Sequence, residues 1–216
     1  MTGVIFDLDG TLLDTLEDLK DGVNAALSHF GYPARTLAEV RRFVGNGVGR
    51  LIDLAVPEGA DPQPVLAWFR AYYADHCRIK TAPYEGIMEA LEQIGQEYSL
   101  AIVSNKPDFA VKALCADYFP GIFALGEHPG CPRKPAADMV RLAMEAMGVE
   151  TCIYVGDSEV DVATAKNAGV PCLSVLWGFR DQKELAQMGA THFCAHPLEL
   201  YSLIKTVLSL DAHQKM

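Results

Sequence analysis

Hydrophobic positions in much of the chain form short apolar runs that alternate with stretches of helical spacing. The apolar runs are residues 4–6, 100–103, 122–125, 152–155, 172–176 and 191–194. Between the runs, apolar residues recur every three or four positions, as at Ile87, Leu91 and Ile94, which is the period of an amphipathic helix. Short apolar strands that are each followed by a helix are typical of a parallel sheet covered on both faces. These segments therefore predict an α/β domain.

Residues 14–83 have a different pattern. Two stripes with helical spacing occur there: Leu16, Leu19, Val23, Leu27 and Phe30 form one, and Val65, Trp68, Phe69 and Tyr72 form the other. A glycine-rich turn lies between them, and no strand pattern is visible in the block. We therefore expect residues 1–13 and 84–216 to form an α/β core, and residues 14–83 to form an all-helical cap inserted after the first strand.

Composition narrows the class of protein. The chain has 216 residues, half of them hydrophobic, which suits one domain with an insert. We expect a soluble, cytoplasmic protein, because no apolar run approaches the roughly 20 residues that cross a bilayer and the N-terminus lacks the features of a signal peptide. The net charge of −10 argues against nucleic acid or an anionic membrane as partner. The scattered cysteines and histidines do not have the spacing of a zinc site.

The first apolar run ends in an acidic motif. Residues 7–12 read Asp-Leu-Asp-Gly-Thr-Leu, so Asp7 and Asp9 follow the predicted strand and precede Gly10. The carboxyl ends of strands are where α/β sheets bind ligands, which favours a functional role for both carboxylates. A simple turn at Asp9 and an exposed strand end at Asp7 are the structural alternative. An EF-hand calcium loop is excluded, because its glycine stands at the sixth position and not at the fourth.

Two more polar segments come directly after predicted strands. Ser104 and Asn105 follow one apolar run, and an acidic segment with Asp157 and Asp161 follows another. Helix capping would account for Ser104 or Asp157 alone. It would not require acidic residues at positions 157, 159 and 161 together, although carboxylates do favour the first turn of a helix.

Lys134 stands just before a stretch of helical spacing. A lysine beside a helix N-terminus is unfavourable for the helix dipole, so an anion bound there would explain its position. A solvated surface lysine is an equally good alternative.

In a parallel sheet these segments meet. Asp7, Ser104 and Asp157 each follow a strand and so share one edge, which Lys134 can also reach. Carboxylates with a hydroxyl and an ammonium are what a metal ion and a phosphate group together require. Mg²⁺ takes carboxylates, waters and phosphate oxygens as ligands. It would also offset the repulsion between two carboxylates, which is roughly 4 kcal/mol at about 4 Å and an effective dielectric of about 20.

In this order the motifs resemble those of the haloacid dehalogenase superfamily of phosphohydrolases. The shared pattern is DxDGTLxDT at residues 7–15, Ser-Asn at 104–105, Lys-Pro at 134–135 and GDSxxD at 156–161. The resemblance covers almost the whole chain and implies a doubly wound, Rossmann-like parallel sheet with an inserted helical cap. Within the superfamily, residues 44–47 and 104–107 are most similar to the phosphoglycolate phosphatase branch.

The resemblance implies a role for each residue of the pattern. Asp7 would be the nucleophile that forms a phosphoaspartate, and Asp9 would be the general acid and base. Asp7, the backbone carbonyl of Asp9 and Asp157 would hold Mg²⁺, with Asp161 in support. The residues that bind or orient the phosphoryl group would be Thr11, Ser104, Asn105 and Lys134.

The glycine-rich turn is the candidate substrate-binding segment of the cap. Backbone NH groups of Gly45, Asn46 and Gly47 are candidates to bind a substrate carboxylate, and a helix-breaking turn beside surface arginines is the alternative. The arginines near this turn in the sequence are Arg41, Arg42 and Arg50.

These inferences together predict a Mg²⁺-dependent phosphatase, monomeric or homodimeric, that acts on a small phosphomonoester, with 2-phosphoglycolate as the lead candidate. A pyrophosphatase or a β-phosphoglucomutase-like phosphosugar mutase shares the cap type and most motifs. A phospho-accepting receiver module also uses clustered aspartates, but such a module is usually shorter and lacks a large helical insert. An inactive relative kept for binding is a further alternative, which the intact acid, hydroxyl and lysine set disfavours.

Overall fold

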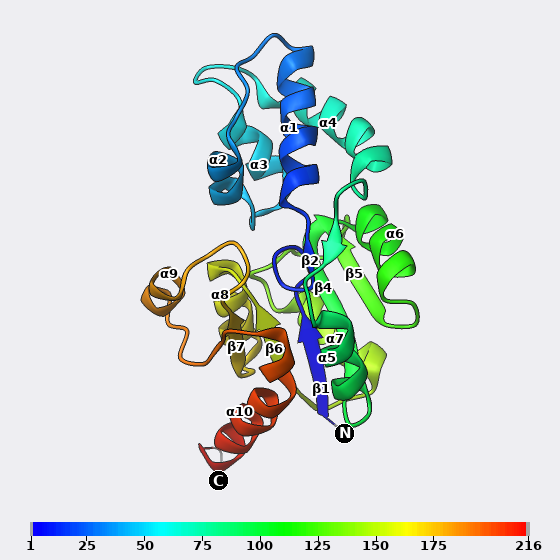
Figure 1. Ribbon diagram of the computed structural model, residues 1–216, viewed down its shortest axis with the longest axis vertical. Coiled ribbons are helices and arrows are strands. Elements are labelled where there is room, and N and C mark those ends of the chain that lie inside the picture. Colours follow the sequence, from blue (N-terminus) through cyan, green and yellow to red (C-terminus); the bar gives the residue numbers. More distant parts are fainter. Residues whose placement is uncertain (1, 215–216) are drawn as a thin grey trace.

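The computed structural model describes residues 2–214, and its centre is a six-stranded parallel sheet (Figure 1). In the order β5–β4–β1–β6–β7–β8, the strands span Phe123–Glu127, Ser99–Pro107, Thr2–Phe6, Thr151–Gly156, Cys172–Val175 and Phe193–Cys194. Each apolar run that the sequence analysis identified as a strand lies in or overlaps one of them. The prediction of a parallel α/β sheet is confirmed.

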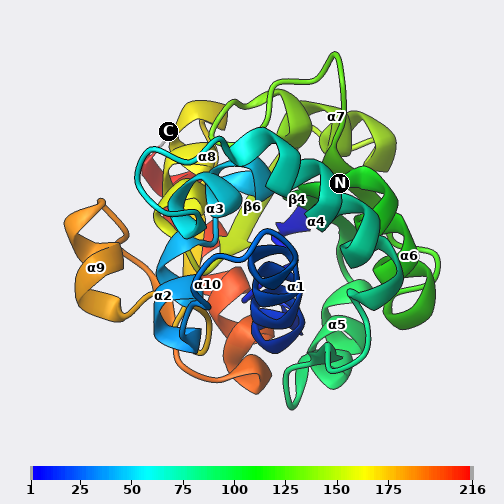
Figure 2. The same ribbon diagram turned by 90° about the horizontal axis from the view of Figure 1, so that it is seen from above.

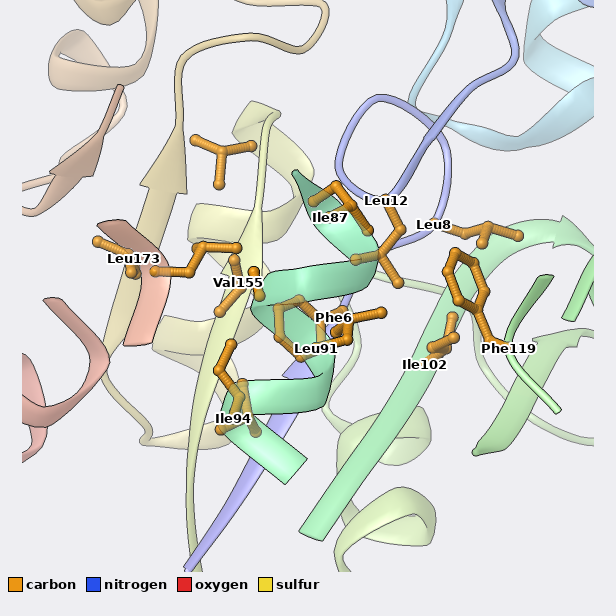
Figure 3. Packing of buried hydrophobic residues seen from close by; sticks show 14 of the residues in the cluster. Phe6, Leu8, Leu12, Ile87, Leu91, Ile94, Ile102, Phe119, Val155 and Leu173 are labelled. Atoms are coloured by element: carbon orange, nitrogen blue, oxygen red, sulfur yellow. The ribbon is translucent and has the colours of Figure 1, made fainter. Parts of the chain in front are cut away.

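Side chains of a strand alternate between the two faces of the sheet. Val4 and Phe6 of β1 lie in one apolar cluster, while Ile5 lies in the cluster on the opposite face. Figure 3 shows Phe6 packed near Leu91 and Ile102 on the first face. Each fully buried side chain of this kind stabilises the fold by about 1.5–3 kcal/mol relative to its exposed state, so the central strand is firmly fixed.

Helices cover both faces, as the doubly wound arrangement requires. One face is covered by α5 (Ile87–Gly95), α6 (Asp108–Tyr118) and α10 (Leu200–Gln214), and the other by α7 (Asp138–Met147) and α8 (Glu159–Ala168). The short helices α9 (Gln182–Gln187) and η1 (Pro197–Glu199) follow β7 and β8. Within residues 2–214, no helix combines the length and the apolar character that crossing a membrane would need.

Four helices lie above the carboxyl edge of the sheet (Figures 1 and 2). These cap helices are α1 (Leu16–His29), α2 (Leu37–Phe43), α3 (Gly47–Ala55) and α4 (Pro62–His76). They enclose an apolar cluster of their own, in which Val23, Leu27, Ile52 and Phe69 are fully buried. A separate cluster favours a cap unit, for which the boundary at residues 14–83 stays a prediction.

A two-stranded ribbon joins the cap helices to the sheet. β2 (Leu13–Asp14) pairs antiparallel with β3 (Ala82–Pro83). The prediction that residues 14–83 contain no strand is therefore wrong at the two ends of that block. Each of these strands has only two residues, which is too short to display an alternating pattern.

The strand order places β1 at a topological switch point. The chain passes from β1 to β4 and β5 on one side, and then crosses to β6 on the other side of β1. Ligands of open α/β sheets bind outside the carboxyl ends of the strands at such a point. The edge beneath the cap helices, where β1, β4 and β6 end, is therefore the expected position of a site.

Candidate active site

The predicted catalytic segments converge at the switch point. Asp7 follows β1, and Asp157 follows β6. Ser104 lies near the end of β4, and Lys134 lies in the loop before α7. All four residues line one cavity beneath the cap helices. The backbone NH of Asp7 donates to the carbonyl of Val155 at 2.9 Å, so sheet pairing continues past β1 and fixes the backbone of Asp7.

Lys134 lies at the centre of a buried charged cluster. Its Nζ is 2.8 Å from Oδ1 of Asp7 and 2.9 Å from Oδ1 of Asp161. It also donates to the hydroxyl of Tyr154 at 3.0 Å. Burial disfavours the ammonium, but the charges of Asp161 and Asp7 outweigh that effect and raise the pKa of Lys134. The side chain therefore remains charged although it is only 2% exposed.

The surroundings of Lys134 differ from both sequence interpretations of this residue, a lysine beside a helix N-terminus and a solvated surface lysine. The residue precedes α7 by four positions, because the helix begins at Asp138, so it does not stand at the helix N-terminus. Nor is it a solvated surface lysine, because its side chain is buried. Its neighbours Arg133 and Pro135 are exposed, and the local pattern therefore contains no sign of burial.

Asp161 is hydrogen-bonded on both carboxylate oxygens. Oδ2 accepts from the backbone NH groups of Asp157 and Ser158, at 3.2 and 3.0 Å, and from the Ser158 hydroxyl at 2.6 Å. Oδ1 accepts from Lys134 and from the hydroxyl of Tyr154. Because Ser158 and Asp161 also form the capping box of α8, the start of this helix fixes the loop and the lysine. This geometry suits a supporting role.

Asp157 is fully buried in a tightly built turn. Its Oδ1 accepts from the Thr11 hydroxyl at 3.0 Å, and its Oδ2 accepts from the backbone NH of Phe179 at 2.7 Å. A Cβ at Gly178 would lie 2.3 Å from Cβ of Asp157, and one at Gly10 would lie 2.4 Å from Oδ2. Both glycines are therefore needed to seat this carboxylate. Thr11, predicted to orient the phosphoryl group, directs its hydroxyl at Asp157.

The buried carboxylates crowd one another. Ligand oxygens of Asp7, Asp157 and Asp161 lie within 4.8 Å of one another. Burial, followed by the charge of Asp161, raises the pKa of Asp7 to about 7. The same two causes raise the pKa of Asp157 well above its ordinary value. A hard divalent cation such as Mg²⁺ would offset the repulsion among these buried carboxylates, and carboxylate oxygens are the ligands that it prefers. Asp161 accepts five hydrogen bonds and Asp157 accepts two, so Asp7 and Asp157 are the side chains with more capacity left to bind the ion.

Ser104 lies within β4 and does not follow it, because the strand extends to Pro107 after a shift in its register with β5. The apolar run ends earlier than the strand, so the sequence pattern places the strand end too soon. Ser104 lines the cavity, and its Oγ accepts from the backbone NH of Lys106 at 3.2 Å.

Asn105 connects three parts of the site. Its Nδ2 donates to the carbonyl of Lys134 at 2.9 Å and to the carbonyl of Gly45, in the cap segment, at 3.2 Å. The amide therefore fixes the loop of Lys134 and contacts the cap. Its Oδ1 is buried and has no hydrogen-bond partner within the described part of the chain, which leaves an acceptor for a ligand donor.

Lys106 is a charged residue of this cavity to which the motifs assigned no role. Its Nζ donates to Oδ1 of Asp9 at 2.9 Å and to the hydroxyl of Tyr73, on α4, at 2.8 Å. The side chain is 1% exposed. Burial opposes its charge, but Asp9 and Tyr73 outweigh that effect and raise the pKa of Lys106. The only local signal was the position of Lys106 in the polar segment of residues 104–107, which follows an apolar run.

The cap helices close the cavity with mostly apolar side chains. Leu19 of α1 and Val48 and Leu51 of α3 line it, together with Phe179 from the loop after β7. The volume of the cavity is about 40 Å³, which suits a few water molecules or a small ligand group.

The glycine-rich turn contributes to this wall in part. Gly45 and Gly47 line the cavity, and their φ angles of 122° and 77° are in the left-handed region that favours glycine. Asn46 is the N-cap residue of α3 and is not among the residues that line the cavity. The predicted segment is therefore brought to the site through its glycines.

The arginines near this turn have other partners. Arg41 donates to the carbonyls of Gly178 and Phe179 at 2.7 and 2.9 Å, so it ties α2 to the loop after β7. Arg50 pairs with Asp53 on the same helix. Arg41, Arg42 and Arg50 are absent from the described residues that line the cavity. These arginines are therefore near the turn in the sequence without lining the cavity.

Comparisons with known proteins agree with this geometry. Residues 4–175 match the family model of the haloacid dehalogenase-like hydrolases. The chain is 35% identical over 192 residues to a phosphoglycolate phosphatase of Cereibacter sphaeroides, with 83% of this chain and 87% of the relative covered. A provisionally named phosphoglycolate phosphatase structure from Lactobacillus delbrueckii subsp. bulgaricus superposes with a TM-score of 0.88 and 37% identity, covering 94% of this chain and 97% of that one.

A more distant structure shares the fold. A provisionally named β-phosphoglucomutase from Thermotoga maritima has a TM-score of 0.71 at 21% identity, with 96% of this chain and 100% of that chain covered. The family match and the relatives together confirm the resemblance drawn from the motifs. The chain belongs to the haloacid dehalogenase-like hydrolases.

Proposed function

We propose that the protein is a Mg²⁺-dependent phosphatase that hydrolyses a small phosphomonoester through an aspartyl-phosphate on Asp7. The observation that supports this best is the buried Lys134 ammonium, 2.8 Å from Oδ1 of Asp7 at the sheet edge where Asp157 also lies. A carboxylate next to a fixed cation is suited to attack phosphorus while the cation offsets charge on the phosphoryl oxygens. The names of the relatives make 2-phosphoglycolate the lead candidate substrate.

The proposed reaction has two halves. In the first, an Asp7 oxygen attacks phosphorus, the bond from phosphorus to the ester oxygen breaks, and Asp9 donates a proton to the departing oxygen. In the second, Asp9 takes a proton from water, the water oxygen attacks phosphorus, and inorganic phosphate leaves with Asp7 restored. Lys134 and Ser104 bind the phosphoryl oxygens in both halves, and Asn105 helps to orient them.

Asp7, Asp157 and the backbone carbonyl of Asp9 would hold Mg²⁺, and Asp161 would support them. When bound, the ion would supply positive charge that offsets the negative charge on the phosphoryl oxygens. The charge and the hydrogen bond of Lys134 favour the ionised form of Asp7. This helps catalysis, because a protonated carboxyl is a poor nucleophile. Thr11 keeps Asp157 in place through its hydroxyl.

The cap would select the substrate. Gly47 begins the nine-residue helix α3 and, with Gly45, lines the cavity. Backbone NH groups at a helix N-terminus attract anions, so the turn with Gly45, Asn46 and Gly47 would bind a substrate carboxylate. The apolar side chains around it favour a compact substrate.

A substrate panel scored for phosphate release tests this function. We expect 2-phosphoglycolate to be hydrolysed faster than pyrophosphate or hexose phosphates, and Asp7→Asn to abolish turnover with the fold intact, because the amide cannot attack. Asp75→Asn, on the exposed side of α4, is the matched control. Full activity of Asp7→Asn would refute the nucleophile. Preferred cleavage of pyrophosphate would instead identify a pyrophosphatase, and conversion of a sugar phosphate without free phosphate a mutase.

A further inference from the structure

The environment of Lys106 joins the site to the cap. Its Nζ lies 2.9 Å from Oδ1 of Asp9 and 2.8 Å from Oη of Tyr73, and it is 4.9 Å from the centroid of the Tyr73 ring. Asp9 comes from the loop after β1, Lys106 from the end of β4 and Tyr73 from α4. One ammonium therefore bridges the predicted acid–base residue and a cap helix.

The position of Tyr73 depends on the packing of the cap helices. The residue is 1% exposed, and its ring stacks on Phe69 with 5.0 Å between centroids. Its Cδ2 lies 3.0 Å from the place that a Cβ at Gly22 of α1 would occupy. Since the ring belongs to α4 and packs against α1, a movement of the cap helices relative to the sheet would carry the Tyr73 hydroxyl away from Lys106.

We propose that Lys106 is a positioning residue that orients the Asp9 carboxylate for proton transfer, and that Tyr73 makes this orientation depend on a closed cap. The proposal rests on the proposed function, because it assigns proton transfer to Asp9. The terminal torsion of an aspartate is broad and weakly restricted. A charge-assisted hydrogen bond to Oδ1 restricts that torsion, and Oδ2 is then left to face the ester oxygen and later the water.

The competing role for Lys106 is direct binding of the phosphoryl group. Substrates with different leaving groups distinguish this role from positioning of Asp9. An alkoxide needs a proton as it departs, whereas p-nitrophenolate does not. A residue that acts through Asp9 therefore affects kcat/KM for alkyl phosphates selectively, because this parameter covers the steps up to cleavage of the ester bond. A residue that binds the phosphoryl group affects both substrates alike.

The experiment measures kcat/KM of the wild-type protein and its variants, loaded with Mg²⁺, for p-nitrophenyl phosphate and for the best alkyl monoester of the panel. We expect Lys106→Met to lower the alkyl value about 10²-fold and the nitrophenyl value by no more than about threefold. Tyr73→Phe, which removes only the hydroxyl, should lower the alkyl value about tenfold with the same selectivity.

The double variant tests whether the two residues act together. If Tyr73 acts through Lys106, the double variant should be no worse than Lys106→Met alone, because effects of coupled residues do not add. Matched controls are Lys112→Met, on the exposed side of α6, and Tyr72→Phe, half-buried between Trp68 and His76. Both controls should remain within about twofold of the wild type.

Equal losses for both substrates in Lys106→Met, or additive losses in the double variant, would overturn the proposal while the proposed function stands. A wild-type protein that releases phosphate from none of the monoesters would instead overturn the proposed function. Far-UV circular dichroism and urea unfolding check each variant. If Lys106→Met does not fold, Tyr73→Phe decides alone, and a loss that is not selective for the alkyl ester then refutes the proposal.

Discussion

Raising the pH of the metal-free protein from 5 to 8 should lower its free energy of unfolding. The reason is the buried carboxylate of Asp7, whose pKa burial and the charge of Asp161 raise from 3.8 to about 7. Below pH 4 both the folded and the unfolded chain hold the Asp7 proton. Between about pH 4 and pH 7 the folded chain holds it and the unfolded chain does not, so stability falls as the pH rises. Above pH 8 both states are ionised, and the loss is complete.

The size of the effect follows from the pKa of Asp7. The folded and unfolded values differ by about three pH units, and each unit corresponds to about 1.4 kcal/mol. The total loss is therefore roughly 4 kcal/mol, of which roughly 3 kcal/mol falls between pH 5 and pH 8. Asp157 adds to the loss in the same direction, because its pKa is also raised by burial.

Urea unfolding in the presence of a chelator, measured at several pH values, gives the free energies. Asp7→Asn serves as the reference, because an amide resembles the protonated acid and does not titrate. The stability of this variant minus that of the wild type should grow by roughly 3 kcal/mol from pH 5 to pH 8. A difference that stays constant over this range would refute the reasoning. Saturating Mg²⁺ should stabilise the wild type at pH 8 by roughly 3 kcal/mol at a hundredfold excess over its Kd, and Asp7→Asn much less.

Three further results are expected. Asp9→Asn should lower phosphate release by at least about 10²-fold, since the amide cannot transfer the proton; near-normal turnover would exclude Asp9 as the acid and base. The same change should lower the free energy of unfolding, because it leaves the buried Lys106 ammonium without its carboxylate partner. Removing Mg²⁺ with a chelator should stop turnover, and adding the ion back should restore it; activity that persists would exclude the metal requirement. Gly178→Ala would place a Cβ 2.3 Å from Cβ of Asp157 and should weaken Mg²⁺ binding about tenfold by calorimetry, so unchanged affinity would contradict the predicted metal role of Asp157.

The sheet and the enzyme family could be predicted because their signals are local. Apolar runs identify strands, and acidic residues directly after them mark the carboxyl edge of a parallel sheet. Asp7 and Asp157 thus lie together although they follow strands that are far apart in the sequence: Thr2 and Thr151, the first residues of β1 and β6, are 149 positions apart. The parallel pairing of β1 with β6 brings the carboxyl ends of the two strands side by side.

Contacts that depend on three-dimensional packing could not be predicted. Lys106 and Tyr73 are 33 positions apart. The apolar stripe predicted in that region included Tyr72 and not Tyr73, whereas Tyr73 is the buried residue and Tyr72 is half-buried. The burial of Lys134 depends on Tyr154 and Asp161 from other elements. Arg41 lies near the candidate substrate-binding turn in the sequence, but its guanidinium donates to carbonyl groups of the loop after β7, which the residues around Arg41 do not reveal.

The short ribbon of β2 and β3 has a consequence for how proteins of this architecture diversify. Paired strands lie about 4.8 Å apart, so the intervening helical block leaves and rejoins the rest of the chain at nearly the same point. A block attached in this way can be lengthened, exchanged or lost while the six parallel strands keep their order, because the remaining ends are already neighbours. Recombination at this junction would therefore exchange the cap wall of the cavity while Asp7, Lys134 and Asp157 keep their places at the edge of the sheet.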